Sequence, residues 1–328
     1  MYRNNIIAVV IPNYNEEDKI GPTLSEMPDY VDTIYVVDDC STDGSVAAIQ
    51  NKMKDDDRIE LIEHTINKGV GAAISTGYKR VNAVGEDIAV VMAGDGQMDP
   101  VDLPSLLDPL VNDVADYTKG NRFFHRLGVG EIPKVRLIGN LTLSGLTKVV
   151  SGYWHISDTQ CGYTAINKKF LDYVEWDEVY PRYGCPNDIL TRLNIVNARV
   201  AETPVKARYG QSWASKMKVR QVAGPILSLL FSLFMLRIYR KHIYLDGHPL
   251  VFCYGVGILS GILAILTSFY LVVALLVTGG LSLIGLVFFS MFSIISNQLL
   301  LSAFSMDYEV NKDLCVRLSY PHRKRANW

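Results

Sequence analysis

Four short polar segments of the chain carry side chains that could bind a ligand or a metal ion. They span residues 12–16, 38–41, 67–69 and 95–97. Carboxylates accept strong hydrogen bonds from N–H and O–H donors, and carboxylate and amide oxygens are ligands for hard divalent cations. Asp95 and Gln97 stand two residues apart, so both side chains could turn toward one cation. Tyr14 adds a flat aromatic face against which a ring could pack.

Each polar segment follows an apolar run that is typical of a buried strand. Residues 6–11 form a continuous apolar run rich in β-branched side chains, and we expect Pro12 to end this strand. Further strands are predicted at residues 33–37, 59–63 and 88–92. Helices are predicted near 17–27, 44–53 and 70–84, and Ser41, Thr42 and Asp43 are good capping residues before the second of them.

This alternation of strands and helices predicts a mostly parallel α/β sheet. In such sheets, ligands bind beyond the carboxyl ends of the strands. We therefore expect the four polar segments to converge on one edge of the sheet and to form a single site. Beyond residue 113 the pattern is weaker, and it predicts a strand at 116–119, helices at 133–153 and 186–199, and a strand at 200–205.

The composition changes sharply near the C-terminus. Residues 250–306 contain no Asp, Glu, Lys, Arg or His, whereas charged residues make up 20% of the whole chain. A bilayer core is crossed by about 20 apolar residues in a helix, so we predict two spans, at 250–277 and 281–305. Thr278, Gly279 and Gly280 supply the turn between them. The alternative is a pair of helices buried in a soluble core.

Basic residues near the ends of the predicted spans indicate how the chain would sit in a membrane. Arg237, Arg240 and Lys241 precede the spans and a basic segment containing Lys312 and Arg317 follows them, so both ends are expected to be cytoplasmic. The N-terminus lacks a secretory signal. Residues 217–245 combine an apolar stretch with basic flanks and are predicted to form an interfacial helix; a helix packed on the globular domain is the alternative.

Several other classes of site find no support in the sequence. The five cysteines are scattered without metal-ligand spacing, which indicates a reducing compartment, and the six histidines form no cluster. The net charge of −2 identifies no partner, and we expect no nucleic acid to bind. Gly255, Gly257 and Gly261 would let helices approach closely, which would allow a homo-oligomer through the spans, although their spacing could also be incidental.

The polar segments together resemble those of a known enzyme family. The sequences VIPNYNE (10–16), VDDCSTDG (37–44), NKGVG (67–71) and DGQ (95–97) stand in the order found in family 2 glycosyltransferases, which have the GT-A fold. The C-terminal hairpin resembles that of the polyprenyl-phosphate branch, which includes dolichol-phosphate mannose and glucose synthases. The resemblance implies transfer of a sugar from a nucleotide-diphosphate donor to a polyprenyl (dolichyl) phosphate, with inversion, at the cytoplasmic face of the cell membrane.

The resemblance also implies roles for individual residues at the donor site. The nucleotide sugar would be bound by Pro12, Tyr14, Glu16, Asp39, Lys68, Gly94 and Asp95. A divalent metal, Mg²⁺ or Mn²⁺, would be held by Asp95 and Gln97. The family usually has a second Asp two residues before Asp95, but here that position is Ala93, which removes one carboxylate ligand. An Asp accepts hydrogen bonds from uracil and guanine alike, so UDP and GDP donors both stay open.

The predicted catalytic residues are Asp95, Arg122, Asp158, Arg208 and Lys216. By resemblance, the three basic residues would neutralise the departing diphosphate, although the segment that contains Lys216 is two residues longer than the family pattern. Asp158 would lie near the sugar. For Asp188, at the start of a predicted helix, a catalytic acid and a helix cap remain equal alternatives.

The acceptor determines whether the enzyme needs a base. A phosphate monoester has a second pKa of about 6, so it is already mostly dianionic at neutral pH and can attack without losing a proton, whereas a hydroxyl acceptor requires a positioned carboxylate. Two alternative functions stay open. A processive polysaccharide synthase is disfavoured because a Gln-x-x-Arg-Trp motif is missing, and an inactive scaffold subunit is suggested by Ala93.

These interpretations divide the chain into four parts. They are a catalytic domain at 1–216, juxtamembrane interfacial helices at 217–248, a transmembrane hairpin at 249–306 and a basic cytoplasmic tail at 307–328.

Overall fold

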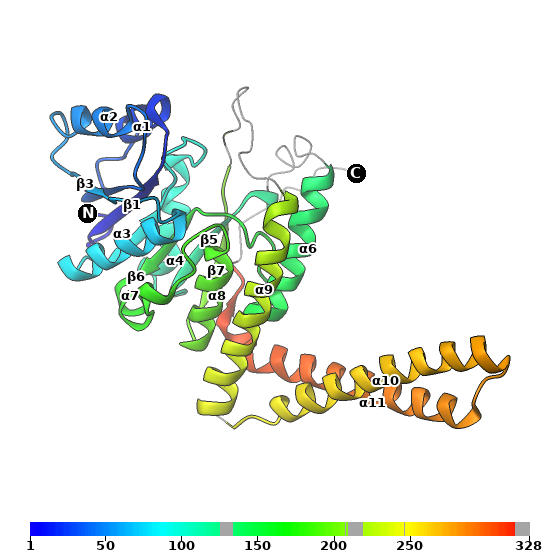
Figure 1. Cartoon of the computed structure of the whole chain (residues 1–328). Helices are drawn as coiled ribbons and strands as arrows, with labels where there is room; N and C mark the ends of the chain where they lie inside the picture. The colour runs from blue at the N-terminus through cyan, green and yellow to red at the C-terminus, as the bar shows by residue number, and fades with distance from the viewer. Residues whose placement is uncertain (125–133, 207, 209–218, 246, 319–328) are drawn as a thin grey trace, which may run out of the picture. The chain divides into compact units, whose positions relative to one another are not determined.

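The computed structural model describes residues 1–124, 134–206, 208, 219–245 and 247–318 (Figure 1). These residues belong to two compact units. The first unit comprises Met1–Phe234 together with the segment that begins at Asp313, and the second comprises Met235–Lys312.

The first unit is built around one eight-stranded sheet. Its strands are β1 (Ile7–Asn13), β2 (Thr33–Asp38), β3 (Ile59–Glu63), β4 (Ile88–Val91), β5 (Tyr117–Asn121), β6 (Thr164–Asn167), β7 (Val200–Pro204) and β8 (Cys315–Val316). The strand order is β3-β2-β1-β4-β6-β5-β7-β8. Strand β6 is antiparallel to both of its neighbours, and the other pairs are parallel. The predicted α/β sheet is confirmed.

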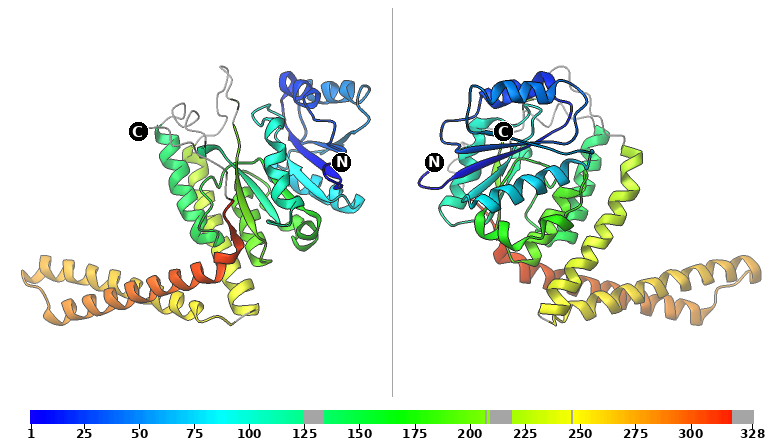
Figure 2. Two further views of the ribbon diagram at one scale, coloured as in Figure 1. Left: turned by 180° about the vertical axis from the view of Figure 1, so that it is seen from behind. Right: turned by 60° about the vertical axis from the view of Figure 1, so that its left-hand side comes forward.

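Helices cover both faces of this sheet, as Figure 2 shows for α1 and α2 on one side and α3 on the other. The α-helices are α1 (Glu17–Ser25), α2 (Ser45–Lys52), α3 (Val70–Val84), α4 (Leu103–Val111), α6 (Lys134–Ser151), α7 (Lys168–Tyr173), α8 (Cys185–Ile195) and α9 (Val219–Arg237). The described residues also form one π-helical segment, η4 (Ile238–Leu245). Four short 3₁₀ turns are η1 (Pro100–Asp102), η2 (Arg122–Phe124), η3 (Trp176–Glu178) and η5 (Lys312–Leu314).

Strand β1 shows why the buried strands read as unbroken apolar runs. Successive side chains of a strand point to opposite faces. Ile7 and Val9 therefore join the core beneath α1, α2 and α4, whereas Ala8 and Val10 join the core beneath α3, α7 and α8. All four side chains are fully buried, so no position in this strand is left for a polar residue.

One expectation about the sheet is wrong, and one strand was not expected. Pro12 does not end β1, which continues to Asn13. Val10 accepts a hydrogen bond from Met92 of the β4 side, and alternate residues bond to the same neighbour, so Pro12 also faces β4. Because β4 ends at Val91, the missing N–H of the proline removes no ladder bond. Strand β6 was not predicted at all.

Two described elements lie at or beyond the predicted boundary between the hairpin and the tail at residues 306 and 307. Helix α11 (Leu283–Asn311) extends beyond residue 306, and β8 then pairs with β7 at Cys315 and Val316. The predicted boundary between residues 216 and 217 lies outside the described residues.

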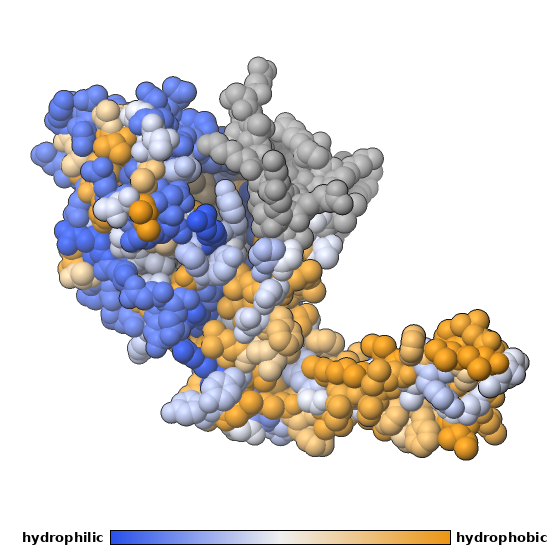
Figure 3. All heavy atoms as spheres, in the orientation of Figure 1, coloured by the Kyte–Doolittle hydropathy of each residue, from blue (hydrophilic) through white to orange (hydrophobic). Residues whose placement is uncertain are grey.

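The second unit contains a hairpin of two long apolar helices, α10 (Leu250–Thr278) and α11. Gly279 ends α10 in the left-handed conformation, with φ of +71°. Both helices are long and apolar enough to cross a membrane, and only 17% and 11% of their most apolar windows are buried within the chain. Figure 3 shows the strongly apolar surface of this hairpin. Such low burial is atypical of core helices in a soluble protein.

Small residues bring the two hairpin helices together. A Cβ on Gly257 would lie 3.1 Å from the Leu300 side chain, and one on Gly261 would lie 2.9 Å from Ser296. Gly257 and Gly261, two of the three glycines considered for helix packing between subunits, therefore pack within the hairpin itself. A Cβ on Gly255 would meet no neighbouring side chain within 4 Å.

Two of the basic residues before the hairpin are buried rather than exposed. Arg237 forms an ion pair with Asp307 at 2.6 Å, and both side chains are fully buried. The Lys241 ammonium donates to Asn311 at 2.9 Å. These two charges therefore do not face water or lipid headgroups. They do not indicate which side of a membrane the ends of the hairpin occupy.

Candidate active site

A pocket opens at the carboxyl ends of β1 and β2, where the sheet-edge rule predicts a ligand site. Its lining residues are Pro12, Asn13, Tyr14, Asp39, Asn67, Gly69, Val70, Ala73, Arg182 and Tyr183. The pocket has a volume of about 200 Å³ and opens to solvent. Three of the predicted nucleotide-binding residues, Pro12, Tyr14 and Asp39, thus share one pocket.

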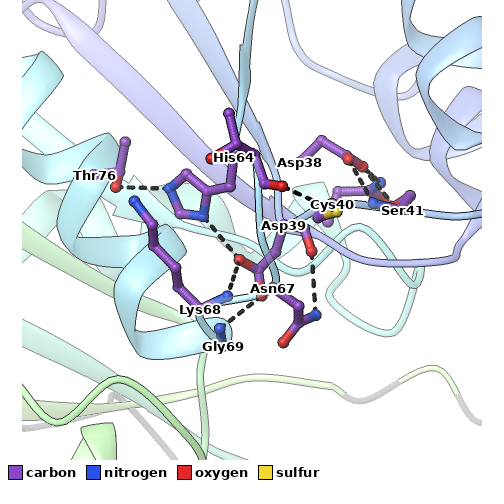
Figure 4. Close-up of polar contacts among 11 residues, drawn as sticks. Asp38, Asp39, Cys40, Ser41, His64, Asn67, Lys68, Gly69 and Thr76 are labelled. Atoms are coloured by element: carbon purple, nitrogen blue, oxygen red, sulfur yellow. Dashed lines mark hydrogen bonds and ion pairs between the residues drawn. The ribbon is translucent and has the colours of Figure 1, made fainter.

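Asp39 is buried at the base of this pocket and fastens a neighbouring loop (Figure 4). One carboxylate oxygen, Oδ1, accepts from the Lys68 N–H at 2.9 Å, and the other, Oδ2, accepts from the Gly69 N–H at 2.7 Å. The ring of His64 contacts Oδ1 at 2.8 Å. A carboxylate oxygen can accept two hydrogen bonds, so Oδ2 retains capacity for a donor from a ligand.

His64 was missed by the sequence analysis although it immediately follows β3. Its Nδ1 contacts Asp39, and its Nε2 lies 3.0 Å from the hydroxyl of Thr76 on α3. The histidine therefore links the Asp39 carboxylate to α3. Its position after a strand that ends at the same sheet edge was the available signal.

Asp38 has a structural role beneath the pocket. Its carboxylate accepts from the Asn13 amide at 2.8 Å and from the Ser41 hydroxyl and backbone N–H at 2.6 and 2.8 Å. These bonds tie the β1 and β2 loops together beneath the pocket. Lys68 contributes its backbone to Asp39, while its side chain is exposed.

The glycines of the NKGVG segment allow a second loop to approach α3. The Pro181 carbonyl accepts from the Gly71 and Ala72 N–H groups at 2.8 and 3.2 Å. Gly69 has φ of +101°, and a Cβ there would lie 2.5 Å from the Pro181 oxygen. A free helix N-terminus attracts anions, but here a backbone carbonyl occupies that position.

Asp188 holds this second loop in place. Its carboxylate accepts from the Tyr180 N–H at 2.6 Å and from the Arg192 guanidinium at 2.8 Å. Arg192 in turn donates to the Glu178 carboxylate and carbonyl. Burial raises the pKa of the Asp188 carboxyl, although the charge of Arg192 opposes the shift. The carboxylate neither caps its own helix nor lines the pocket.

Asp95 and Gln97 lie in contact on the loop after β4. The Gln97 N–H donates to Asp95 Oδ1 at 3.1 Å, and the Gln97 side-chain amide donates to Oδ2. Burial raises the pKa of Asp95, and the nearby Glu16 carboxylate adds to the shift. A Cβ on Gly94 would lie 3.0 Å from the Asn13 side-chain oxygen, so this loop packs against the pocket rim.

These residues fit a divalent cation with few protein ligands. In the described ranges no three His, Cys, Asp or Glu side chains gather around one point. Asp95 nevertheless offers a half-buried carboxylate near a second negative charge, that of Glu16. Mg²⁺ is commonly held by one or two carboxylates, with substrate phosphates and water completing its shell. Gln97 would have to turn its amide oxygen toward the ion, because its NH₂ group faces Asp95.

Arg122 and Asp158 form a bidentate ion pair. The Arg122 Nε and Nη2 atoms donate to the two Asp158 oxygens at 2.7 and 2.8 Å, and the Arg122 backbone N–H donates at 3.2 Å. The Asp158 backbone N–H donates to the buried Glu202 carboxylate at 2.9 Å. Two predicted catalytic residues are thus brought together, but as partners of each other.

Arg208 lies close to the loop after β4 but is bound by acidic residues. Its N–H donates to the Gln97 carbonyl at 2.9 Å, and its guanidinium pairs with Asp99 at 2.8 Å and with Glu26. Glu16, another predicted ligand residue, pairs with Lys19 at 2.7 Å. Lys216 lies outside the described residues.

Comparisons with known proteins find related sequences. Residues 8–174 match the family described as Glycosyl transferase family 2. The chain is 30% identical over 219 residues to a UDP-N-acetylglucosamine–dolichyl-phosphate N-acetylglucosaminyltransferase of Methanococcus voltae, covering 63% of this chain and 87% of that protein. It is 30% identical to the polyprenol monophosphomannose synthase of Mycolicibacterium smegmatis, covering 64% of this chain and 80% of the relative.

A solved structure shares the fold. Glucosyl-3-phosphoglycerate synthase from Mycobacterium tuberculosis, in complex with Mn²⁺, uridine diphosphate and glucosyl-3-phosphoglycerate, superposes with a TM-score of 0.52 at 18% identity. The match covers 71% of this chain and 80% of that one. The expected GT-A fold is confirmed.

Proposed function

The chain belongs to glycosyl transferase family 2 and is a glycosyltransferase, and on this premise we propose that it transfers a sugar from a nucleotide-diphosphate donor to a polyprenyl phosphate. The pocket containing Tyr14 and Asp39 carries the donor part of the proposal, because it offers an aromatic face and a carboxylate oxygen beside each other. The names of the two relatives above, one dolichyl-phosphate and one polyprenol enzyme, support the acceptor.

The donor diphosphate is proposed to lie toward Asp95. When bound there, Mg²⁺ or Mn²⁺ would neutralise the charge of the leaving nucleoside diphosphate. Asp95 would hold the ion and Gln97 would assist it. Glu16 would accept from the ribose, which places a hydrogen-bond acceptor between the base and the phosphates.

Arg122, Arg208 and Lys216 are proposed to assist departure of the diphosphate. A guanidinium has five N–H donors, so an arginine paired with a carboxylate can also contact a phosphate. Carboxylate partners would hold Arg122 and Arg208 in fixed orientations, which lowers the entropy lost on binding the substrate.

The proposed acceptor agrees with the state of Asp158, which we place near the sugar. Both of its oxygens accept from Arg122, so the carboxylate is already engaged by a guanidinium and serves to hold that arginine rather than to take a proton from the acceptor. A polyprenyl phosphate requires no base, because it is already an anion at neutral pH. With a phosphate acceptor, we expect direct attack of the phosphate on the anomeric carbon, which inverts that carbon.

We further propose that the protein is attached to the cell membrane through α10 and α11, with the catalytic unit and both termini in the cytoplasm. The length and low burial of the two helices support attachment. Leu227 and Phe231 stand four residues apart on α9 and are both exposed, which suits a helix lying in the membrane interface. Exposed Lys312 and Arg317 support the orientation.

The test is a transfer assay with the full chain in lipid vesicles. Labelled UDP- and GDP-sugars are supplied with polyprenyl phosphate and Mg²⁺ or Mn²⁺, and lipid products are identified by mass. A lipid-linked single sugar is expected, and its formation should be lost in Asp95→Asn. A polymeric product would instead favour a polysaccharide synthase. Nucleotide-sugar binding without turnover with any acceptor would favour the inactive subunit that Ala93 suggests.

A further inference from the structure

The segment 180–183 contributes two side chains to the donor pocket that no motif of the sequence indicated. Arg182 and Tyr183 both line the pocket and are both exposed. Tyr14 lines the same pocket from the loop after β1. Two tyrosines and one arginine therefore line the same pocket as Asp39.

Arg182 lies close to Asp39 through one intermediate residue. A Cβ on Gly69 would be 2.9 Å from the Arg182 Cγ, and the Gly69 N–H donates to Asp39 Oδ2 at 2.7 Å. In the described part of the chain, the Arg182 side chain has no ion pair and no hydrogen bond. It contrasts with Arg122, Arg192 and Arg208, which are all bound to carboxylates.

The backbone that carries Arg182 is held from both sides. The Pro181 carbonyl accepts from the first turn of α3, and the Tyr180 N–H donates to the buried Asp188 carboxylate. Such fixation lowers the entropy lost when a ligand binds. The position of Arg182 at the pocket is thus built into the fold.

The chemistry of a nucleobase matches this pair of charged groups. Guanine and uracil both present a ring N–H directly beside an exocyclic carbonyl oxygen, and adenine and cytosine present a ring nitrogen lone pair beside an amino group. Asp39 can accept from the ring N–H, and a guanidinium can donate to the adjacent carbonyl. In the same register, adenine or cytosine would place donor against donor and acceptor against acceptor.

We propose that Arg182 is a specificity-determining residue that reads the carbonyl oxygen of the donor's base while Asp39 reads the neighbouring ring N–H. This assignment rests on the proposed function, since it places the nucleoside of the donor in the pocket. It assigns a role in base selection to a loop more than 100 residues from the pocket's other walls in sequence.

The experiment measures nucleotide binding by calorimetry with the full chain in detergent. The ligands are GDP, UDP, ADP, CDP, the nucleosides guanosine and uridine, and inorganic pyrophosphate. For the wild type, GDP or UDP should bind at least about 10-fold more tightly than ADP or CDP. In Arg182→Gln the affinity for the preferred nucleotide and its nucleoside should fall about 10- to 100-fold, since the charge-assisted hydrogen bond from the guanidinium to the carbonyl oxygen is lost. Pyrophosphate binding should not change.

Two further variants sharpen the test. Arg80→Gln removes an exposed arginine on α3 that pairs with Glu60, so it serves as a matched control with unchanged affinity. Arg182→Lys keeps the charge but loses the planar fork, and it should recover less than half of the lost binding free energy. Full recovery by lysine, or a loss confined to pyrophosphate and the diphosphates, would overturn the assignment.

Failure of this inference is distinguishable from failure of the proposed function. If the wild type forms lipid-linked sugar and Arg182→Gln binds all nucleotides as the wild type does, only the role of Arg182 is refuted. If the wild type binds none of the nucleotides, both proposals fail together.

Discussion

The ion pair between Arg122 and Asp158 allows a direct test of whether this enzyme uses a catalytic base. Asp158→Asn keeps the side chain's size but removes its charge. The amide oxygen can still accept one bond from the guanidinium, while its NH₂ group would face another donor. If Asp158 acts only by holding Arg122, the variant should lose activity because the arginine is no longer positioned. Proton transfer should not be affected.

The expected loss of kcat/KM depends on how deeply the ion pair between Arg122 and Asp158 is buried. Removing one partner of a fully buried ion pair costs about 3–5 kcal/mol. The Asp158 side chain is 2% exposed, but that of Arg122 is 27% exposed, so water can recover part of the lost interaction. We expect about 2–3 kcal/mol, which corresponds to a fall in kcat/KM of about 30- to 150-fold if the whole effect is felt in the transition state.

The assay is a double-mutant cycle on kcat/KM for the donor, with the lipid acceptor saturating. It compares the wild type, Asp158→Asn, Arg122→Gln and the double variant. Each single change breaks the same interaction. The kcat/KM of the double variant should therefore lie within about threefold of that of the less active single variant, with a coupling energy of about 1.5–2.5 kcal/mol.

A double variant whose loss equals the product of the two single losses would refute this reasoning. So would a loss near 10⁴-fold or more in Asp158→Asn that Arg122→Gln does not share, because general-base catalysis contributes about 10²–10⁴-fold on its own.

Three further predictions concern the metal, the loop and the sheet. Ala93→Asp should restore a carboxylate near Asp95 and lower the Mn²⁺ concentration for half-maximal nucleotide binding, measured by calorimetry; an unchanged or higher requirement would argue against a cation at this loop. Gly69→Ala should raise the KM for the donor at least about tenfold, since strained backbone and a clash cost about 1–3 kcal/mol; an unchanged KM would show that the loop contact is dispensable. Burial would raise the pKa of Asp116, but hydrogen bonds and charge from Arg199 outweigh it and hold the pKa below its ordinary value. The stability it supplies is therefore present above the unfolded-state pKa of about 3.9 and lost as the pH falls through the folded-state pKa. Asp116→Asn should cost about 1–3 kcal/mol at pH 7, and the difference in Tm from the wild type should shrink in acid; a difference that is the same at both pH values would contradict it.

The regular α/β half of the fold could be predicted from the sequence because its signals are local. Strand β3 and helix α3 lie at the predicted residues. The apolar runs are continuous because these strands are buried on both faces. Strand β6 escaped prediction because its four residues, TAIN, pair with β4 and β5 at long range and carry no periodicity of their own.

The pocket wall could not be predicted for a similar reason. The contact between Pro181 and Gly71 joins segments more than 100 residues apart. The glycines at 69 and 71 were a visible sign that backbone approaches closely there, but they do not say which backbone. His64 and Arg182 therefore entered the site only through the structure.

Residue types at the sheet edge were readable from the sequence, but their partners were not. The acidic and basic residues of the site were identified separately as ligands and as phosphate contacts. In the structure, Arg122 is paired with Asp158, and Arg208 is paired with Asp99 and Glu26. The partner of each charged residue depends on which loops meet in the fold. The spacing of charges along the chain does not determine which loops meet.

The way these carboxylates are satisfied bears on the acceptor. Asp38, Asp39, Asp158 and Asp188 each accept at least two hydrogen bonds from protein donors. Each oxygen engaged in this way has fewer lone pairs left to accept a proton from a substrate hydroxyl. Burial raises the pKa of both Asp95 and Asp188, but Asp188 is bound by Tyr180 and Arg192 away from the pocket, and Asp95 must stay ionised as the proposed metal ligand. A hydroxyl acceptor would therefore find no suitable base among these five residues, whereas a lipid phosphate would need none.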